Sequence, residues 1–513
     1  MRRKPLMLLC AAVLVPATVF ATTGSASAAS GSLTVTTYNR QGAKVATPLV
    51  IFNVATNVRY TMTSGKTKSL AKGTYAVLAS IHSTKDSSDT VGARVVKITG
   101  KTSTTIDARS GRALKFTLDK SPGGTPDVQA HLCAADSSMG VDAYNTAGKV
   151  FVIPNGSKHL HSSFSTTWQS FSNEQWVIGT SHTTIPTSLT RTVKRSSLAT
   201  LTSVVKKGVA GGAETNIALQ GEGSTGSCRD SMYIGLNQAE APFTMKTHFS
   251  GGKWLVRTES IATEQGNFVG IGNQWVTKTF TGGKSYSQTN FRSAWGPGIH
   301  RPEVTTGNRI GFSTDAMFTD PGFGWQNLDG WEASQKSTVW LYKGSKLIKK
   351  QTRSNWGDAD SGFQAKVPSA GWYRLKVSAQ RYRPGIKYPS DLLSNKAGVW
   401  FSFYANPKKE DTAIPVSLPR LSPAGLDMTN RAKPRSTTTV NIKTQGTAAK
   451  SMTAKASFDG GKTWKSVPVR KTGTTWAATV KNPAAGTIAL RAQAKTSKGY
   501  TTEVTIYRAY RIN

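Results

Sequence analysis

Two loop-like stretches between residues 276 and 412 bring indole rings and carboxylates together, FTDPGFGWQNLDGWE and SNWGDADSG. Flat indoles stack well on sugar rings, and loop carboxylates can bond sugar hydroxyls or hold a hard cation such as Ca²⁺. We therefore predict a ligand-binding site here, with Asp358 and Asp360 as candidate Ca²⁺ ligands and no other cofactor. The alternative is that the indoles fill the ends of a β-sandwich while the aspartates make Asx turns. The candidate residues are Trp325, Trp331, Trp356, Asp320, Asp329, Asp358 and Asp360.

Three further tryptophans of the same region lie in strand-like runs such as TVWLYKG and GVWFSFYA. Large apolar side chains within strands usually pack into a core. We therefore predict that Trp340, Trp372 and Trp400 are buried.

Residues 457–464, SFDGGKTW, fit the pattern S-x-D-x-G-x-T-W of an Asp-box. Glycosidase propellers repeat this box blade after blade, and hydrolysis of a glycosidic bond also needs a pair of carboxylates. Here the box occurs once, in a stretch too short for a propeller. We expect Asp459 to accept turn N–H bonds, Gly461 to permit positive φ and Trp464 to pack over the hairpin. Together with Ser457, these residues are predicted to form a structural staple.

The first 28 residues have the pattern of a secretory signal. Arg2, Arg3 and Lys4 form a basic start, an apolar run follows, and small residues end it at Ala28. No later apolar run approaches the ~20 residues that a membrane span needs. We therefore expect a secreted protein, extracellular or associated with the cell wall, and no transmembrane span.

Removal of this signal leaves two cysteines, Cys133 and Cys228. An even number of cysteines in an oxidising compartment suggests a disulfide. We predict that these two residues are bonded, the alternative being two buried free thiols.

The chain is strongly basic, with 65 Lys and Arg against 27 Asp and Glu. The charge is spread along the chain: residues 30–125 hold 14 basic and 4 acidic residues, and residues 421–513 hold 16 and 3. Such a surface attracts polyanions, including wall polymers, acidic polysaccharides and, without specificity, extracellular DNA. The alternative is that the excess reflects a compositional bias with no ligand.

Short alternating apolar runs, bounded by Gly, Asn, Asp, Ser and Pro at roughly ten-residue intervals, predict an all-β fold of tandem β-sandwich modules, Ig-like or jelly-roll-like. The one helix that the pattern favours is near 196–208, SSLATLTSVVKKG. Linker-like stretches place a signal peptide at 1–28 and β modules at 30–122, 126–275, 276–412 and 418–513. The second module would contain the disulfide, the third is rich in tryptophan, and the fourth is the Ig-like module with the Asp-box.

The order of several phrases resembles one known kind of protein. GSLTVTTYNRQGAKV comes early, VPSAGWYRLKVSAQR and GVWFSFYA follow, and TIYRAYRIN comes near the end. This order resembles the non-catalytic C-terminal accessory region of large secreted actinobacterial subtilisin-like serine peptidases, over nearly the whole exported chain. The resemblance implies a string of accessory β-sandwich modules.

The catalytic domain of that family is missing. Such peptidases present Asp, His and Ser in that order, in D-[ST]-G, H-G-T and G-T-S-M-A contexts. Gly179-Thr180-Ser181 is followed by His182 where that pattern has Met, and no H-G-T occurs. Because a triad needs one scaffold to hold its three members, we predict no peptidase activity. The expected function is non-catalytic binding of an extracellular or cell-surface polymer; the alternatives are an adjunct of a secreted peptidase and a hydrolase with an unrecognised site.

Overall fold

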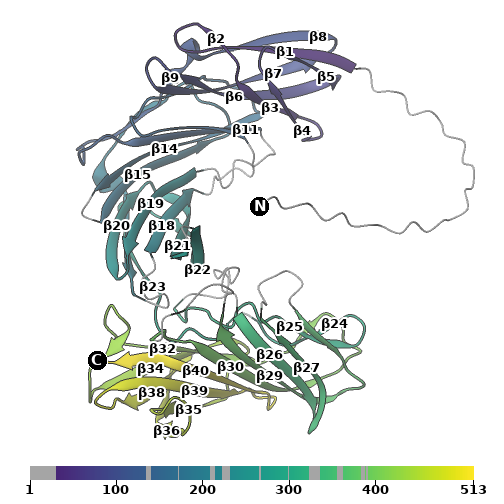
Figure 1. Cartoon of the computed structure of the whole chain (residues 1–513), viewed down its shortest axis with the longest axis vertical. Helices are drawn as coiled ribbons and strands as arrows, with labels where there is room; N and C mark the ends of the chain where they lie inside the picture. The colour runs from purple at the N-terminus through teal and green to yellow at the C-terminus, as the bar shows by residue number, and fades with distance from the viewer. Residues whose placement is uncertain are drawn as a thin grey trace, which may run out of the picture.

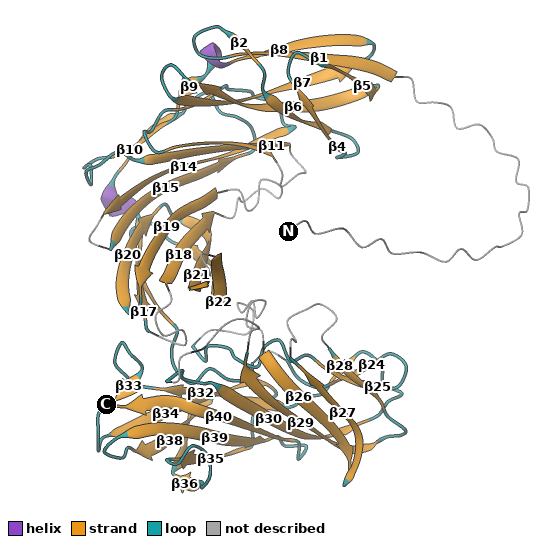
Figure 2. Ribbon diagram, viewed as in Figure 1, coloured by secondary structure: helices purple, strands orange, loops and turns teal. Residues whose placement is uncertain are grey.

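The computed structural model describes residues 30–513 except 135–139, 171–172, 208–213, 222–231, 265–266, 299, 323–334, 355–361, 383–387 and 389–390. The described chain is built almost wholly of β-strands, with two 3₁₀ turns, η1 (Ala108–Ser110) and η2 (Arg195–Ser197). The predicted all-β fold of tandem β-sandwiches is confirmed (Figures 1 and 2).

The N-terminal sandwich has two sheets around a core that includes Leu33, Ile51, Val77 and Ile106. The smaller sheet contains β1 (Ser30–Tyr38), β2 (Lys44–Val45), β5 (Thr67–Ala71) and β8 (Lys101–Asp107). The larger sheet runs in the order β4-β3-β6-β7-β13-β9. Its strands are β3 (Pro48–Asn53), β4 (Arg59–Thr63), β6 (Gly73–Ser83), β7 (Ser88–Ile98), β9 (Arg112–Ala113) and β13 (Val150–Val152).

The middle of the chain forms a seven-stranded sheet in the order β12-β11-β14-β15-β20-β17-β23. Its strands are β11 (Asp127–Ala134), β12 (Gly140–Asn145), β14 (Leu160–Ser170), β15 (Glu174–His182), β17 (Ala199–Val205), β20 (Phe243–Phe249) and β23 (Ser285–Asn290). A four-stranded sheet contains β18 (Glu214–Gly221), β19 (Met232–Glu240), β21 (Gly252–Glu264) and β22 (Asn267–Phe280). The parallel pair of β10 (Lys115–Leu118) and β16 (Thr190–Val193) completes this region.

The C-terminal region is dominated by a nine-stranded sheet, in the order β27-β26-β29-β30-β40-β39-β35-β36 with β33 beside β40. Its strands are β26 (Gln335–Lys343), β27 (Lys346–Arg353), β29 (Gly371–Arg381), β30 (Lys396–Ala405), β33 (Arg431–Ala432), β35 (Ser451–Ser457), β36 (Lys465–Val467), β39 (Gly486–Lys495) and β40 (Thr501–Ile512).

Two four-stranded sheets share one apolar core with the nine-stranded sheet. The first contains β24 (Glu303–Thr305), β25 (Arg309–Phe312), β28 (Phe363–Lys366) and β31 (Thr412–Ala413). The second contains β32 (Ser417–Pro423), β34 (Thr437–Gly446), β37 (Val469–Thr472) and β38 (Thr475–Lys481). The core joins Phe401 and Val504 of the large sheet to Ile310, Phe363 and Ile442 of the smaller ones.

The helix expected near 196–208 is wrong. Residues 195–197 form the η2 turn, and residues 199–205 form strand β17, hydrogen-bonded between β20 and β23. Ala199, Leu201, Ser203 and Val205 are buried in alternation, which is the period of a strand. Four of the seven residues of β17 are Thr or Val, whose branched Cβ atoms favour extended backbone.

Backbone pairing crosses three of the predicted module boundaries. β13 pairs with β7 across the boundary at 122–126, and β23 pairs with β17 across the boundary at 275–276. β30 pairs with β40 across the boundary at 412–418, so the last two predicted modules share one sheet. The Trp-rich segment and the Asp-box segment therefore belong to the same large sheet.

Candidate functional site

The nine-stranded sheet presents aromatic side chains on both of its faces. Along β30 the pattern of buried and open positions alternates, so Phe401 and Phe403 point inward and Trp400 and Tyr404 point outward. The inward pair is fully buried, whereas Trp400 is 41% exposed and Tyr404 is 45% exposed. Trp372 on the neighbouring strand β29 also points outward and is 49% exposed. Three large aromatic side chains therefore face outward from two adjacent strands.

This arrangement corrects the predicted burial of the strand tryptophans. Trp372 and Trp400 are exposed, and Trp340 on β26 is only half-buried. The inward positions of these strands already fill the core with residues such as Leu341, Leu375 and Phe401. Because side chains alternate between the two faces of a strand, the intervening indoles must lie on the opposite face.

Lysine side chains flank the outward indoles. Trp340 lies opposite Lys350 of β27 on one side and opposite Lys376 of β29 on the other. The Nζ atoms of Lys350 and Lys376 lie 6.0 Å and 5.2 Å from the centroid of the Trp340 ring. Within the described residues, no carboxylate lies within 4.0 Å of either ammonium group. These two cations therefore remain available to an external anion.

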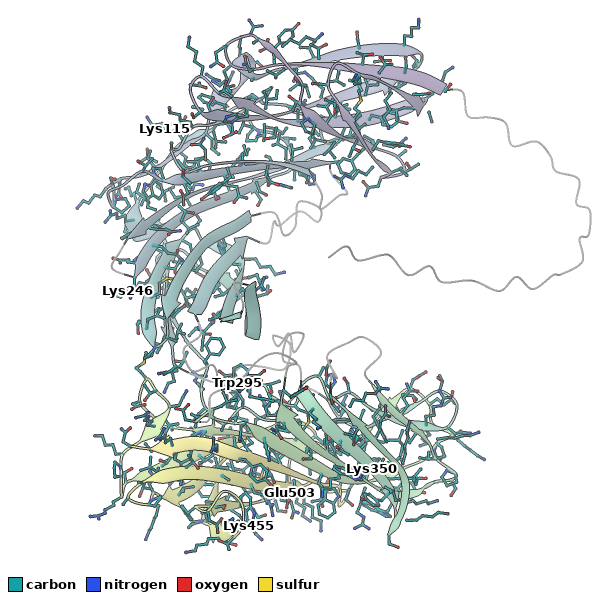
Figure 3. All side chains as sticks on the ribbon, in the orientation of Figure 1. Lys115, Lys246, Trp295, Lys350, Lys455 and Glu503 are labelled. Carbon is teal, nitrogen blue, oxygen red and sulfur yellow. The ribbon has the colours of Figure 1, made fainter. Side chains whose placement is uncertain are left out.

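The four strands that form this part of the sheet carry no acidic residue. β26, β27, β29 and β30 together contain ten Lys and Arg and no Asp or Glu. The first carboxylate beyond them is Glu503 on β40, opposite Trp400 and 3.5 Å from Nε of Arg491. Figure 3 labels Lys350 and Glu503 at two points along this sheet. We name the outward side chains of β26, β27, β29 and β30, together with Glu503, the aromatic–basic face.

At one end of the aromatic–basic face the rings form a corner. The indole of Trp372 meets Tyr404 edge to face, with ring centroids 6.4 Å apart and an angle of 78°. Tyr500, in the turn before β40, meets the same indole at 5.7 Å and 83°. Two perpendicular contacts hold Trp372 in place while about half of its surface stays open. A ring fixed in this way can stack on a ligand with little loss of side-chain entropy.

The Asp-box is closed by local hydrogen bonds. Asp459 accepts the backbone N–H of Thr463 at 2.9 Å and the hydroxyl of Ser457 at 2.7 Å. The Ser457 hydroxyl in turn accepts the N–H of Gly461 at 2.8 Å, and Gly461 has a φ of 94°. Hydrogen bonds from Thr463, and then from Ser457, hold the pKa of Asp459 well below its usual range. The carboxylate is used to fix the turn.

Trp464 of the Asp-box packs onto the same large sheet. Its ring lies 4.1 Å below the guanidinium carbon of Arg491 and meets Tyr507 edge to face at 6.5 Å. Its Nε1 donates to the carbonyl of Gly461 at 3.1 Å. The indole is half-buried, so the box attaches its hairpin to β39 and β40 with one side of the ring covered by a cation.

Asp320 is the only residue of the predicted loop site that the structure describes. It is fully buried, and its carboxylate accepts the N–H groups of Arg292 at 2.9 Å and Gly322 at 2.7 Å. Its backbone carbonyl, with those of three neighbouring residues, accepts the buried guanidinium of Arg420 from β32. Burial lowers the pKa of Arg420 to about 10. This geometry is that of the turn alternative, in which Asp320 orders a loop against the core.

The other predicted site residues lie outside the described residues. Cys133 is buried on β11, opposite His161 of β14. Among the described residues, no group of three or more His, Cys, Asp or Glu is arranged to hold a metal ion. The predicted residues that lie outside the described part of the chain are Trp325, Trp331, Trp356, Asp329, Asp358, Asp360 and Cys228.

The fold and this face define an all-β protein of joined β-sandwiches that presents an aromatic and cationic surface. Among the described residues, no helix has the length and apolar character needed to cross a membrane.

No protein-family model matches the chain, and no curated protein matches it. Among solved structures, it is similar to the FN1–FN3 domains of chicken CNTN1, with 11% identity over 60% of this chain and 99% of that chain and a TM-score of 0.14. It is similar to extracellular domains 3–5 of Drosophila OTK, with 11% identity over 59% and 85% and a TM-score of 0.13. It is also similar to E. coli alpha-2-macroglobulin, with 9% identity over 96% of this chain and 40% of that chain and a TM-score of 0.17. Such weak likenesses carry no argument about function, so the site rests on its geometry.

Proposed function

We propose that the chain is a secreted, non-catalytic protein that binds an anionic extracellular or cell-surface polymer through the aromatic–basic face. The observation that carries this proposal is the outward placement of Trp372, Trp400 and Tyr404 on the face where Lys350 and Lys376, with no described counter-ion, flank Trp340. Exposed apolar rings on a folded surface indicate a place where a ligand or partner binds. The surrounding lysines fix the sign of that ligand's charge as negative.

The two kinds of contact respond differently to salt, which gives the test. Attraction between many phosphates and a general basic surface falls by about 10³–10⁵ in affinity between about 50 and 200 mM salt when 6–10 contacts are made. Stacking on indoles is not screened in this way. Binding through the aromatic–basic face should therefore leave a component that survives high salt.

The experiment is co-sedimentation of the exported chain with purified bacterial cell walls at low and high salt. The Trp372→Ala/Trp400→Ala double variant should lose the salt-resistant component, by about tenfold or more if each stacked ring contributes as aromatic platforms do on other polymers. Tyr144→Ala is the matched control, because Tyr144 is 57% exposed on β12 of a different sheet. Unchanged salt-resistant binding by the double variant would refute the proposal.

Two further parts of the proposal concern export. The basic start, apolar run and small residues of positions 1–28 support cleavage after Ala28, and N-terminal sequencing of protein from the culture medium tests this. In an oxidising compartment Cys133 and Cys228 would form a disulfide. Thiol labelling of the denatured, unreduced chain should then find no free cysteine, and two free thiols would refute the bond.

A further inference from the structure

Positive charges and rings alternate along one line across the aromatic–basic face. The cross-strand partners run from Lys350 to Trp340, then to Lys376, then to Trp400, and end at Glu503. Each step crosses one strand, so the order across the sheet is cation, ring, cation, ring and carboxylate. We name the first four of these residues the charged row.

The spacing of the charged row follows from the sheet. Neighbouring strands lie about 4.7–4.9 Å apart, so Lys350 and Lys376, two strands apart, are separated by about 9–10 Å. Trp340 and Trp400 are separated by the same two strands. This interval is close to the length of two linked pyranose rings. A polysaccharide lying across the strands would then meet a cation at every second sugar.

From this alternation we infer that the charged row binds an acidic polysaccharide that carries its negative group on alternate sugars; this inference rests on the proposed function. In such a polymer the charge is attached to the ring itself, so rings and charges lie along a single line. Single-stranded nucleic acid differs, because its bases project to one side of the phosphates. A nucleic-acid surface therefore needs a track of aromatics beside a separate track of cations.

Glu503 sets the end of the charged row. It lies opposite Trp400 on the side away from Lys376, and its ion pair with Arg491 keeps it on the surface of the sheet. A carboxylate of the ligand placed at the next position would meet this like charge. The alternation puts acidic sugars over Lys350 and Lys376 and an uncharged sugar over Trp400, so the polymer should end or leave the sheet before its next acidic sugar reaches Glu503.

The test compares three polysaccharides at about 200 mM salt, where a diffuse basic surface is weakened. The probes are hyaluronate, with a carboxylate on alternate sugars, polygalacturonate, with one on every sugar, and dextran, with none. A general field of positive charge would prefer polygalacturonate, since it has the higher charge density. The charged row predicts the opposite, with hyaluronate bound about threefold or more tightly than polygalacturonate.

Two lysine variants locate the effect. Lys376→Gln should weaken hyaluronate binding by about three- to fivefold and reduce its advantage over polygalacturonate. Lys246→Gln is the matched control, an exposed lysine on β20 of the seven-stranded sheet that Figure 3 also labels, and it should change neither polymer's binding. Equal effects of the two variants would overturn the inference, because only a general field would then be at work.

The remaining outcomes separate the inference from the proposed function. Tighter binding of polygalacturonate or of a single-stranded oligonucleotide than of hyaluronate would overturn the charged row and leave binding of an anionic polymer in place. Tighter binding of dextran than of hyaluronate would overturn both the charged row and the anionic ligand of the proposed function. Loss of all salt-resistant binding, to these probes and to cell walls alike, would overturn the proposed function itself.

Discussion

The two faces of β29 and β30 both contain aromatic side chains, but one face is buried and the other is exposed. On the inward face Tyr373, Phe401 and Phe403 are fully buried in the core that the large sheet shares with the two smaller sheets. On the outward face Trp372 and Trp400 stay exposed, and Lys376 lies opposite Trp400. Because both faces are aromatic, hydrophobicity alone does not distinguish a core position from a binding position in this sheet. Coverage does: other sheets cover the inward rings, and the outward rings stay open.

The largest expected effect is a difference in the free energy of unfolding between a substitution on the inward face and one on the outward face. Phe403→Ala should lower the free energy of unfolding by about 3–5 kcal/mol, because it leaves a cavity in a closed core. Trp400→Ala, on the opposite face of the same strand, should change the free energy of unfolding by no more than about 1 kcal/mol. Denaturant unfolding of both variants measures this. Equal losses would mean that the outward face is also part of a core.

A smaller loss is expected from the buried guanidinium of Arg420, which donates to four backbone carbonyls in the loops around Gly296 and Asp320. Arg420→Ala should cost about 3 kcal/mol, because four backbone carbonyls lose a charged donor in a buried place. Arg420→Lys is the informative second variant, since an ammonium group cannot span two pairs of carbonyls and should recover only part of the loss. Full recovery by lysine would show that charge matters here and geometry does not.

Trp464 tests whether an outward indole can have a structural role. It is half-buried between Arg491 and Tyr507, so Trp464→Ala should cost about 2 kcal/mol, less than emptying a closed site. The same variant should bind polymer as well as the wild type does. Thermal melts and cell-wall binding are measured together; lost binding with an unchanged melting temperature would extend the aromatic–basic face to the Asp-box.

The smallest effect is the response of the Asp-box hairpin to acid. The pKa of Asp459 is lowered in the folded state, so its contribution to stability is present above the ordinary carboxyl pKa of about 3.9 and is lost as pH falls further. Asp459→Asn should therefore flatten part of the acid limb of a stability–pH curve. A variant whose acid limb matches that of the wild type would show that the carboxylate's hydrogen bonds do not stabilise the fold.

The fold class could be predicted because strand periodicity is local. The alternation in β30 and the Gly, Asn and Pro turns are visible in the sequence, and the strands formed there. The prediction of a helix over 196–208 was wrong because a run of small and apolar residues fits the 3.6-residue period of a helix as well as the two-residue period of a strand. The hydrogen-bonding partners decide between the two. β20 supplies partners 38–50 residues away and β23 supplies partners 85 residues away.

The aromatic–basic face could not be predicted from the indoles themselves. Trp372 and Trp400 have the sequence context of core residues, and only the packing of other sheets decides which face is covered. One signal was present in the sequence. β26, β27, β29 and β30 contain no acidic residue, and several of their lysines are an even number of residues from an indole, which puts both on the same face of the strand. A strand face that alternates lysine with tryptophan indicates a surface position.

The central claim is that polymer binds the outward face of β26, β29 and β30. Hydroxyl-radical footprinting of the protein, with and without hyaluronate at high salt, tests it directly, because oxidation is read residue by residue. We predict protection of Trp340, Trp372, Trp400 and Tyr404, with Tyr144 oxidised equally in both samples. Protection confined to other residues, with these four oxidised as in the free protein, would contradict the account.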